Sequence, residues 1–265
     1  MMKKLQILLV LLMLPLLSWA QTKVNASEII AKINRGEAVS YKNAEITGDL
    51  DLTKLQNMKL KKEGKNKYDT KEYISTVTAP LTFVNCTFKG NVLAYYNPSN
   101  GTSGIFSSSS NEVYNTNFER DVVFENCRFE QESAFKYSKF DGAASFVGSH
   151  FNEEALFKYS DFNKGVNFSN VRFEEDANFK YVKFPAKVSF AGSTFGEEAN
   201  FKYAKFREGV NFQKARFNGT ANFKYADISD SFNIRGADFR GGDDFKYTKL
   251  NNKQVSLTTL LDMNR

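Results

Sequence analysis

A Phe-Lys-Tyr triplet occurs six times in this chain at a constant interval of 22 residues. The triplets begin at Phe135, Phe157, Phe179, Phe201, Phe223 and Phe245. Large apolar residues recur from Val113 to Leu250, with gaps that alternate between five and six residues. From Ala155 to Ala226, a small or β-branched residue stands two positions before each of them. We therefore expect both positions of each unit to face one interior.

This spacing excludes an α-helix and favours short strands. At about 100° per residue, no single helix face would collect residues that are five apart together with those two positions earlier. In a strand, positions i−2 and i share one side, and the remaining two or three residues of a unit can turn a corner. Sides of five, six, five and six residues close a coil of 22, so stacked coils form a parallel β-solenoid. With coils ~4.8 Å apart, residues 113–250 predict about six coils.

Several segments then resemble the pentapeptide-repeat family, whose unit is Ala, Asp or Asn, Leu or Phe, and two variable residues. They are ANFKY at 177–181, 199–203 and 221–225, KARFN at 214–218 and GADFR at 236–240. The resemblance implies an all-β fold, a right-handed quadrilateral parallel β-helix. The chain departs from the family pattern by an extra residue in every second unit, which lengthens two of the four corners.

The N-terminus is typical of a secretory signal peptide over residues 1–20. Two lysines precede an apolar run from Leu5 to Leu17, and Ser18-Trp19-Ala20 supplies a cleavage site after Ala20. An uncleaved membrane anchor is disfavoured because the run is shorter than the ~20 residues of a spanning helix. Cleavage removes two lysines and lowers the formal charge from +6 to +4. We predict an exported protein, periplasmic or extracellular, with no nucleic-acid partner.

The regular repeat divides the chain into five parts. These are a signal peptide (1–20), an N-terminal helical cap (21–40), irregular first coils with insertions at 59–76 and 95–112 (41–112), the regular solenoid (113–250) and a C-terminal cap (251–265).

Both caps are expected from the open ends of a solenoid, which expose core and strand edges. Asn25 as N-cap and Gly36 as terminator predict a short helix from Asn25 to Arg35. The C-terminal cap is apolar, through Val255, Leu257, Leu260 and Leu261. Alternatively, this apolar tail pairs two molecules into a homodimer.

Cys86 and Cys127 occupy matching motifs, FVNCTF and FENCRF. If one coil and a 19-residue excursion separate them, they lie in adjacent coils about 5 Å apart, within reach of a disulfide. If two coils intervene, they cannot meet. A cysteine also suits a small buried position without any bond.

Other chemistry-bearing residues give weaker signals. His150, the only histidine, precedes Phe151 and so points outward, without a Ser or Cys nucleophile that it could activate. Glu132, Glu154, Asp176 and Glu198 recur every 22 residues, where they could share Ca²⁺ or form a glycosidase pair, although acidic corners are usually just solvated. We expect no catalytic residue, no metal ligand and no cofactor.

Two outward columns accompany the core phenylalanines and are the candidate binding surface. The lysine column is Lys136, Lys158, Lys180, Lys202, Lys224 and Lys246, and the tyrosine column is Tyr137, Tyr159, Tyr181, Tyr203, Tyr225 and Tyr247. Lysines ~4.8 Å apart repel each other. One interpretation is structural, with lysine stems along the rod and stacked tyrosine rings. The other is a platform with rings under sugars and ammonium groups near acidic substituents.

The sequence thus predicts a non-catalytic, exported pentapeptide-repeat scaffold or binding protein. The alternatives are a polysaccharide-binding surface along the two columns and a self-assembling structural or adhesion protein of the cell envelope. Its partner would be a glycan or an envelope protein. An enzyme would need a cleft, which only the excursions could supply. Family members that mimic DNA are acidic cytoplasmic rods, unlike this basic chain with its leader.

Overall fold

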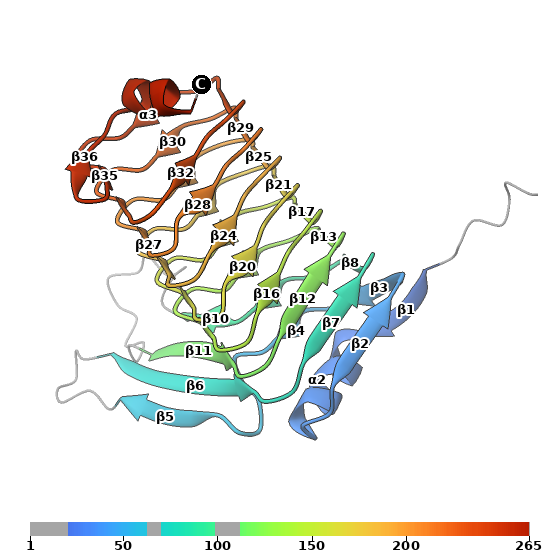
Figure 1. Cartoon of the computed structure of the whole chain (residues 1–265). Helices are drawn as coiled ribbons and strands as arrows, with labels where there is room; N and C mark the ends of the chain where they lie inside the picture. The colour runs from blue at the N-terminus through green and yellow to red at the C-terminus, as the bar shows by residue number, and fades with distance from the viewer. Residues whose placement is uncertain (1–20, 63–69, 99–111, 265) are drawn as a thin grey trace, which may run out of the picture.

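The structure is a computed structural model that describes residues 21–62, 70–98 and 112–264. The predicted signal peptide lies outside these residues, as does most of the second insertion. Short parallel strands stack coil upon coil into a rod, with α2 (Ala26–Asn34) at one end and α3 (Leu257–Met263) at the other (Figure 1). Each coil passes through four sheets, numbered 1 to 4 here in chain order.

Sheets 1 and 2 form two successive sides of the rod. Sheet 1 contains β2 (Val39–Lys42), β7 (Leu81–Val84), β12 (Val122–Glu125), β16 (Ala144–Ser145), β20 (Val166–Asn167), β24 (Val188–Ser189), β28 (Val210–Asn211) and β32 (Phe232–Asn233). Sheet 2 contains β1 (Thr22–Asn25), β3 (Ala44–Thr47), β8 (Thr87–Phe88), β13 (Arg128–Phe129), β17 (His150–Phe151), β21 (Arg172–Phe173), β25 (Thr194–Phe195), β29 (Arg216–Phe217) and β33 (Asp238–Phe239).

Sheets 3 and 4 complete the circuit. Sheet 3 contains β4 (Leu50–Asp51), β9 (Val92–Leu93), β14 (Ser133–Ala134), β18 (Ala155–Leu156), β22 (Ala177–Asn178), β26 (Ala199–Asn200), β30 (Ala221–Asn222) and β34 (Asp243–Asp244). Sheet 4 contains β5 (Lys59–Lys62), β6 (Lys71–Val77), β10 (Tyr95–Tyr96), β11 (Glu112–Phe118), β15 (Lys139–Phe140), β19 (Asp161–Phe162), β23 (Lys183–Phe184), β27 (Lys205–Phe206), β31 (Asp227–Ile228), β35 (Lys249–Leu250) and β36 (Lys253–Gln254).

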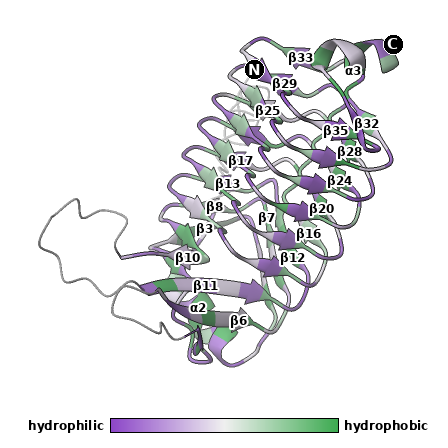
Figure 2. Cartoon of the chain, turned by 90° about the vertical axis from the view of Figure 1, so that its left-hand side faces the viewer, coloured by the Kyte–Doolittle hydropathy of each residue, from purple (hydrophilic) through white to green (hydrophobic). Residues whose placement is uncertain are grey.

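The strand register confirms the 22-residue coil. Phe118 pairs with Phe140, and Phe140 pairs with Phe162. Inside the rod, the Phe179 ring lies 5.1 Å from Phe157 and 5.0 Å from Phe201, with interplanar angles of 1° and 5°. These rings are buried, and each contributes about 1.5–3 kcal/mol by leaving water. Every coil repeats the alternation of hydrophilic and hydrophobic residues (Figure 2).

Buried hydroxyls occupy some of the small inward positions. Several of them donate to backbone carbonyls, whereas Ser133 Oγ and Ser138 Oγ have no hydrogen-bond partner among the described residues. Ser160 Oγ donates to the carbonyl of Phe135 at 2.5 Å, and Ser193 Oγ donates to that of Phe168 at 2.6 Å. A buried hydroxyl without a partner would destabilise the core. The core therefore accepts serine in place of alanine or valine at these corners.

The first two coils already pass through all four sheets. Phe83 pairs with Phe124, a separation of one coil plus the second insertion. The first insertion contains an antiparallel hairpin of β5 and β6, and β10 pairs antiparallel with β11. Both insertions therefore leave the rod at the same corner, between sheets 3 and 4.

The N-terminal end is covered by α2 and by a strand that the apolar repeat does not predict. Asn25 Oδ1 accepts a hydrogen bond from Ser27 N at 2.9 Å and caps the helix. Ile29 and Ile33 are buried against the first coil. Before the helix, β1 extends sheet 2 by pairing with β3.

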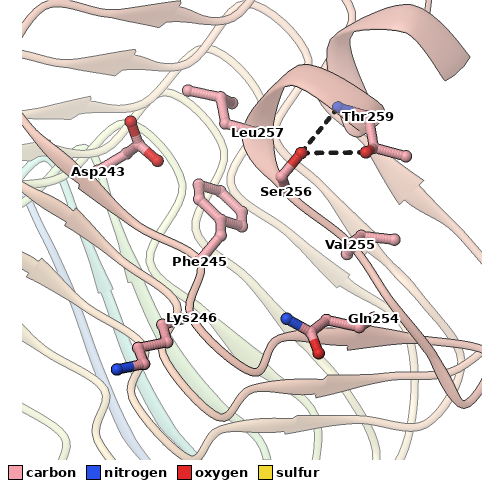
Figure 3. Close-up of a pocket in the computed structure, with 8 residues that line it drawn as sticks. All are labelled: Asp243, Phe245, Lys246, Gln254, Val255, Ser256, Leu257 and Thr259. Carbon is pink, nitrogen blue, oxygen red and sulfur yellow. Dashed lines mark hydrogen bonds between the residues drawn. The ribbon is translucent and has the colours of Figure 1, made fainter.

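At the C-terminal end, α3 covers the last coil, and a pocket of about 500 Å³ lies between them. Figure 3 shows the residues that line this pocket. Ser256 Oγ caps this helix by accepting from Thr259 N at 3.2 Å. Leu260 is buried and Leu257 packs against the core. Leu261, expected in the cap, is 41% exposed because it lies on the outer side of the helix.

Candidate functional site

The lysine and tyrosine columns lie together at the corner between sheets 3 and 4 and form what we call the Lys/Tyr strip. Within each coil, the residue after the triplet closes a turn, as when Val182 N donates to the carbonyl of Phe179 at 3.2 Å. Between coils, Tyr181 N donates to the carbonyl of Lys202 at 3.0 Å. The same bonds recur along the rod and hold both columns in register.

Each strip tyrosine has a left-handed backbone conformation. Their φ angles lie between +60° and +64°, at the third position of a turn that usually takes Gly or Asn. This conformation costs a residue with a Cβ about 1–2 kcal/mol. Ring stacking offsets that cost, because successive centroids are 4.7–4.9 Å apart with interplanar angles of 1–18°.

Stacking also decides which part of each tyrosine meets a ligand. The ring faces lie against neighbouring rings, so the edges and hydroxyl groups remain for contact with solvent. The geometry thus differs from the expected platform with rings under sugars. The strip instead offers a row of phenolic hydroxyls at the spacing of the coils.

The strip lysines lie beside these rings, with each Nζ 5.1–5.9 Å from the centroid of the following tyrosine. Among the described residues, Lys224 alone of the six has a carboxylate within 4 Å, that of Asp244 at 3.8 Å. Burial and the charges of Lys136 and Lys180 lower the pKa of Lys158. Five of the six strip lysines thus have no described carboxylate at ion-pair distance, and Glu154 acts on Lys158 only from farther away.

A neighbouring outward column on sheet 4 provides a contrast. It consists of Lys139, Asp161, Lys183, Lys205, Asp227 and Lys249. Its acids form ion pairs, Lys183 with Asp161 at 3.3 Å and Arg207 with Asp227 at 3.4 Å. Mixed charge is thus compatible with the fold, and its near absence from the strip is a distinct property of that surface.

Asparagine side chains beside the strip accept hydrogen bonds from the backbone N–H groups of strip lysines, a role that a carboxylate could also fulfil. Asn200 Oδ1 accepts from the backbone N–H of Lys202 at 3.2 Å, and Asn222 does the same for Lys224 at 3.2 Å. Asp244 makes the equivalent bond to Lys246 at 2.9 Å. Asparagine fulfils this turn role without adding a counter-charge to the strip.

The acidic column, which consists of Glu132, Glu154, Asp176 and Glu198, forms hydrogen bonds with neighbouring asparagines of the rod. Asn178 Nδ2 donates to Glu154 at 3.3 Å, and Asn222 Nδ2 donates to Glu198 at 2.8 Å. Burial and the charge of Glu154 raise the pKa of Glu132. The described residues contain no group of three or more His, Cys, Asp or Glu side chains placed to bind a metal ion, so the calcium alternative gains no support.

His150 belongs to a surface ion-pair cluster on sheet 2. Its Nε2 lies 2.5 Å from Glu174 Oε1, and its Nδ1 lies 3.1 Å from Arg128 Nη1. Hydrogen bonds from Arg172 and His150 lower the pKa of Glu174. Both ring nitrogens of the imidazole therefore have a side-chain partner.

The two cysteines are buried free thiols in adjacent coils. Their separation in sequence corresponds to one coil plus the excursion, the first of the two alternatives above. Cys127 Sγ contacts the carbonyl of Phe83 at 3.4 Å, and the interaction with Cys86 together with burial raises the pKa of the Cys127 thiol. A disulfide between them stays a prediction.

A comparison with family profiles identifies pentapeptide repeats in five overlapping matches. They cover residues 114–161, 135–183, 157–204, 179–227 and 201–249, which together exceed half of the 265-residue chain. The chain belongs to the pentapeptide-repeat family. Searches of curated proteins and of solved structures found no match. As in other pentapeptide-repeat proteins, the repeats form a parallel β-helix, a fold that generally serves as a scaffold.

The described part of this pentapeptide-repeat protein contains two helices, α2 and α3. Neither has the length and hydropathy that a membrane-spanning helix requires.

Proposed function

We propose that this protein is an exported, non-catalytic pentapeptide-repeat protein that binds an acidic polysaccharide along the Lys/Tyr strip. One observation carries the proposal. Within the described residues, five of the six strip lysines have no carboxylate within 4 Å. Two like charges one coil apart, at ~4.8 Å, repel each other by about 1 kcal/mol even in water. A bound polyanion would relieve that repulsion along the whole rod.

The tyrosines favour an acidic glycan over other linear polymers. Phenolic hydroxyls both donate and accept hydrogen bonds, which suits sugar hydroxyls. Single-stranded nucleic acid instead needs open aromatic faces on which bases stack, and these rings face one another. A neutral glycan would leave the lysines without partners.

The position of the strip supports binding rather than catalysis. It follows an outer corner of the rod, and the site of chemistry in an enzyme is usually a cleft. His150 is held by Arg128 and Glu174 on another side. The export part of the proposal rests on the leader at residues 1–20, and N-terminal sequencing of the mature protein tests whether it begins at Gln21.

Retention on an immobilised polyuronate, polygalacturonate, tests the proposal, with dextran as a neutral reference. The mature chain should be retained on polygalacturonate at low salt, pass through dextran and elute as salt rises. A variant with Lys158→Gln, Lys180→Gln and Lys202→Gln should lose retention by about tenfold or more, because many weak contacts act together.

The matched control carries Lys139→Gln, Lys183→Gln and Lys205→Gln, which removes the same charge from sheet 4. It should be retained like the unmodified protein. Equal losses of retention in both triple variants would show that net charge alone, and not the strip, causes retention. No retention of the unmodified protein would refute the proposal.

A self-assembling scaffold is the second candidate, and the C-terminal end favours it. Asn264 bonds to Phe232 and Ile234 and so covers the edge of β32. Among the described residues, β33 and β34, the last strands of sheets 2 and 3, have no further neighbour, and Phe239 is only partly buried. Sedimentation of the mature chain tests this candidate, since a monomer at high concentration would exclude it.

A further inference from the structure

The Lys/Tyr strip leads into a pocket at its N-terminal side. Lys136 and Tyr137, the first pair of the strip, also line a cavity of about 560 Å³. Lys61, Lys62, Glu72 and Tyr95 line it from the two insertions. The pocket is thus continuous with the proposed binding surface.

Strands from the two insertions lie across the N-terminal end of the strip. In most coils, a sheet 4 strand has two residues, whereas β6 and β11 have seven each and pair in parallel over their full length. They extend beyond the corner of the rod, and β5 lies alongside β6 (Figure 1). Tyr95 pairs with Asn115, and its ring lies 6.0 Å from that of Tyr137 at an angle of 50°. The regular tyrosine stack therefore stops at Tyr95.

The pocket has an excess of positive charge. Its described lining contains Lys61, Lys62 and Lys136 against one carboxylate, Glu72. That carboxylate is already engaged, by Lys61 Nζ at 3.0 Å and Asn115 Nδ2 at 2.9 Å. Lys136 Nζ is positioned by Tyr95, whose hydroxyl lies 3.1 Å away and whose ring centroid lies 4.4 Å away. An anionic group would find two lysines without a carboxylate partner in the described residues.

Asn115 adds an independent polar feature. The bond from its Nδ2 to Glu72 fixes the orientation of the amide. Its Oδ1 is buried and has no hydrogen-bond partner among the described residues. Such an acceptor costs about 1–3 kcal/mol. Asn115 is one of the residues that line the pocket, so a ligand hydroxyl that reached this oxygen would supply the missing donor.

We propose that this pocket binds the terminal, carboxylate-bearing sugar of the acidic polysaccharide that lies along the strip. The inference rests on the proposed function and adds direction to it. A polymer on the strip meets the strands of the insertions at Tyr95 and cannot continue in line, so its end enters the pocket. A terminal uronic acid offers the carboxylate, the hydroxyls and the size that the lining requires.

Binding of a short probe, trigalacturonate, to the mature chain by titration calorimetry tests the pocket. Lys62→Glu reverses an exposed charge in the lining and should weaken trigalacturonate binding at least tenfold. Lys62→Arg keeps this charge and should bind trigalacturonate like the unmodified protein. Lys59→Glu is the matched control, because Lys59 is exposed on the same strand and does not line the pocket. This control should bind trigalacturonate like the unmodified protein.

The long polymer separates this inference from the proposed function. The Lys62→Glu variant should retain polygalacturonate within about threefold of the unmodified protein, while the strip triple variant should keep trigalacturonate binding. Trigalacturonate binding that is lost in the strip variant but not in Lys62→Glu would overturn the pocket and leave the strip intact. The opposite failure would overturn the strip alone: no retention of the unmodified protein on polygalacturonate, together with trigalacturonate binding that Lys62→Glu weakens.

Discussion

Tyr181 and Tyr203 stack with their ring centroids 4.7 Å apart and 1° between their planes, although both backbones have positive φ. A turn at this position usually takes Gly or Asn, which adopt this conformation at little cost. Compared with Gly or Asn, the six successive tyrosines raise the backbone strain of each turn. They also place a row of aromatic rings on the surface. The stack stabilises what each residue alone would not adopt, and it aligns the hydroxyls and lysines in one direction.

The stacking account predicts that substitutions depend on position in the column. Tyr181→Asn relieves the backbone strain but removes two stacked neighbours, whereas Tyr247→Asn removes only Tyr225 at 4.9 Å. We expect Tyr181→Asn to destabilise the fold by about 1 kcal/mol more than Tyr247→Asn, the contribution of one aromatic pair. Urea unfolding of both variants measures the difference. Equal stabilities would show that the rings do not stabilise one another.

The opposite corner, between sheets 1 and 2, predicts a preference for glycine at Gly192, although Asn170 and Lys214 occupy the equivalent positions of the adjacent coils with positive φ. Its φ is +69°, and an added Cβ would collide with Oδ1 of Asn170 in the preceding coil. Gly192→Ala should cost more than about 1–2 kcal/mol, the strain of the left-handed conformation alone. Gly242→Ala is the control, with its nearest atom 3.8 Å away, and should change stability by less than about 0.5 kcal/mol. A comparable loss in the two variants would contradict the described packing.

Ligand binding should be linked to protonation of Lys158. Burial and two neighbouring lysines lower its pKa, so the free protein loses this proton at a lower pH than an ordinary lysine. A polyanion stabilises the ammonium form, so binding raises the pKa and takes up protons. Affinity for polygalacturonate should therefore fall as pH rises through the lowered pKa, below the ordinary value of about 10.4.

Calorimetry at alkaline pH in two buffers of different ionisation enthalpy measures this uptake. Lys158→Arg keeps the charge at every accessible pH and should reduce the uptake. Proton release on binding would have the wrong sign for a cationic strip.

The apolar period was sufficient to predict the rod. Gaps of five and six residues determined the coil length, and the pairing of Phe118 with Phe140 follows from that count. The matching motifs around Cys86 and Cys127 likewise anticipated adjacent coils as one alternative. Such predictions succeed because a core position repeated in every coil leaves few registers that bury all the rings.

The strip itself was located from sequence, but its geometry was not. The 11-residue offset between Asn170 and Tyr181 relates two corner positions that both have positive φ, and this signal could have revealed the strained turn. Ring orientation depends on neighbouring coils, so no single repeat encodes it. The pocket beside Lys136 was not predicted, because it forms only where β6, β11 and Tyr95 lie next to Lys136 in space.

The contact between the Lys/Tyr strip and the acidic glycan can be mapped on the protein itself. Lysines of the mature chain are acetylated with and without polygalacturonate, and mass spectrometry identifies those that the glycan covers. We expect the glycan to protect Lys158, Lys180 and Lys202, while Lys139, Lys183 and Lys205 react as before. Protection of both sets alike, or of the sheet 4 lysines alone, would contradict this expectation.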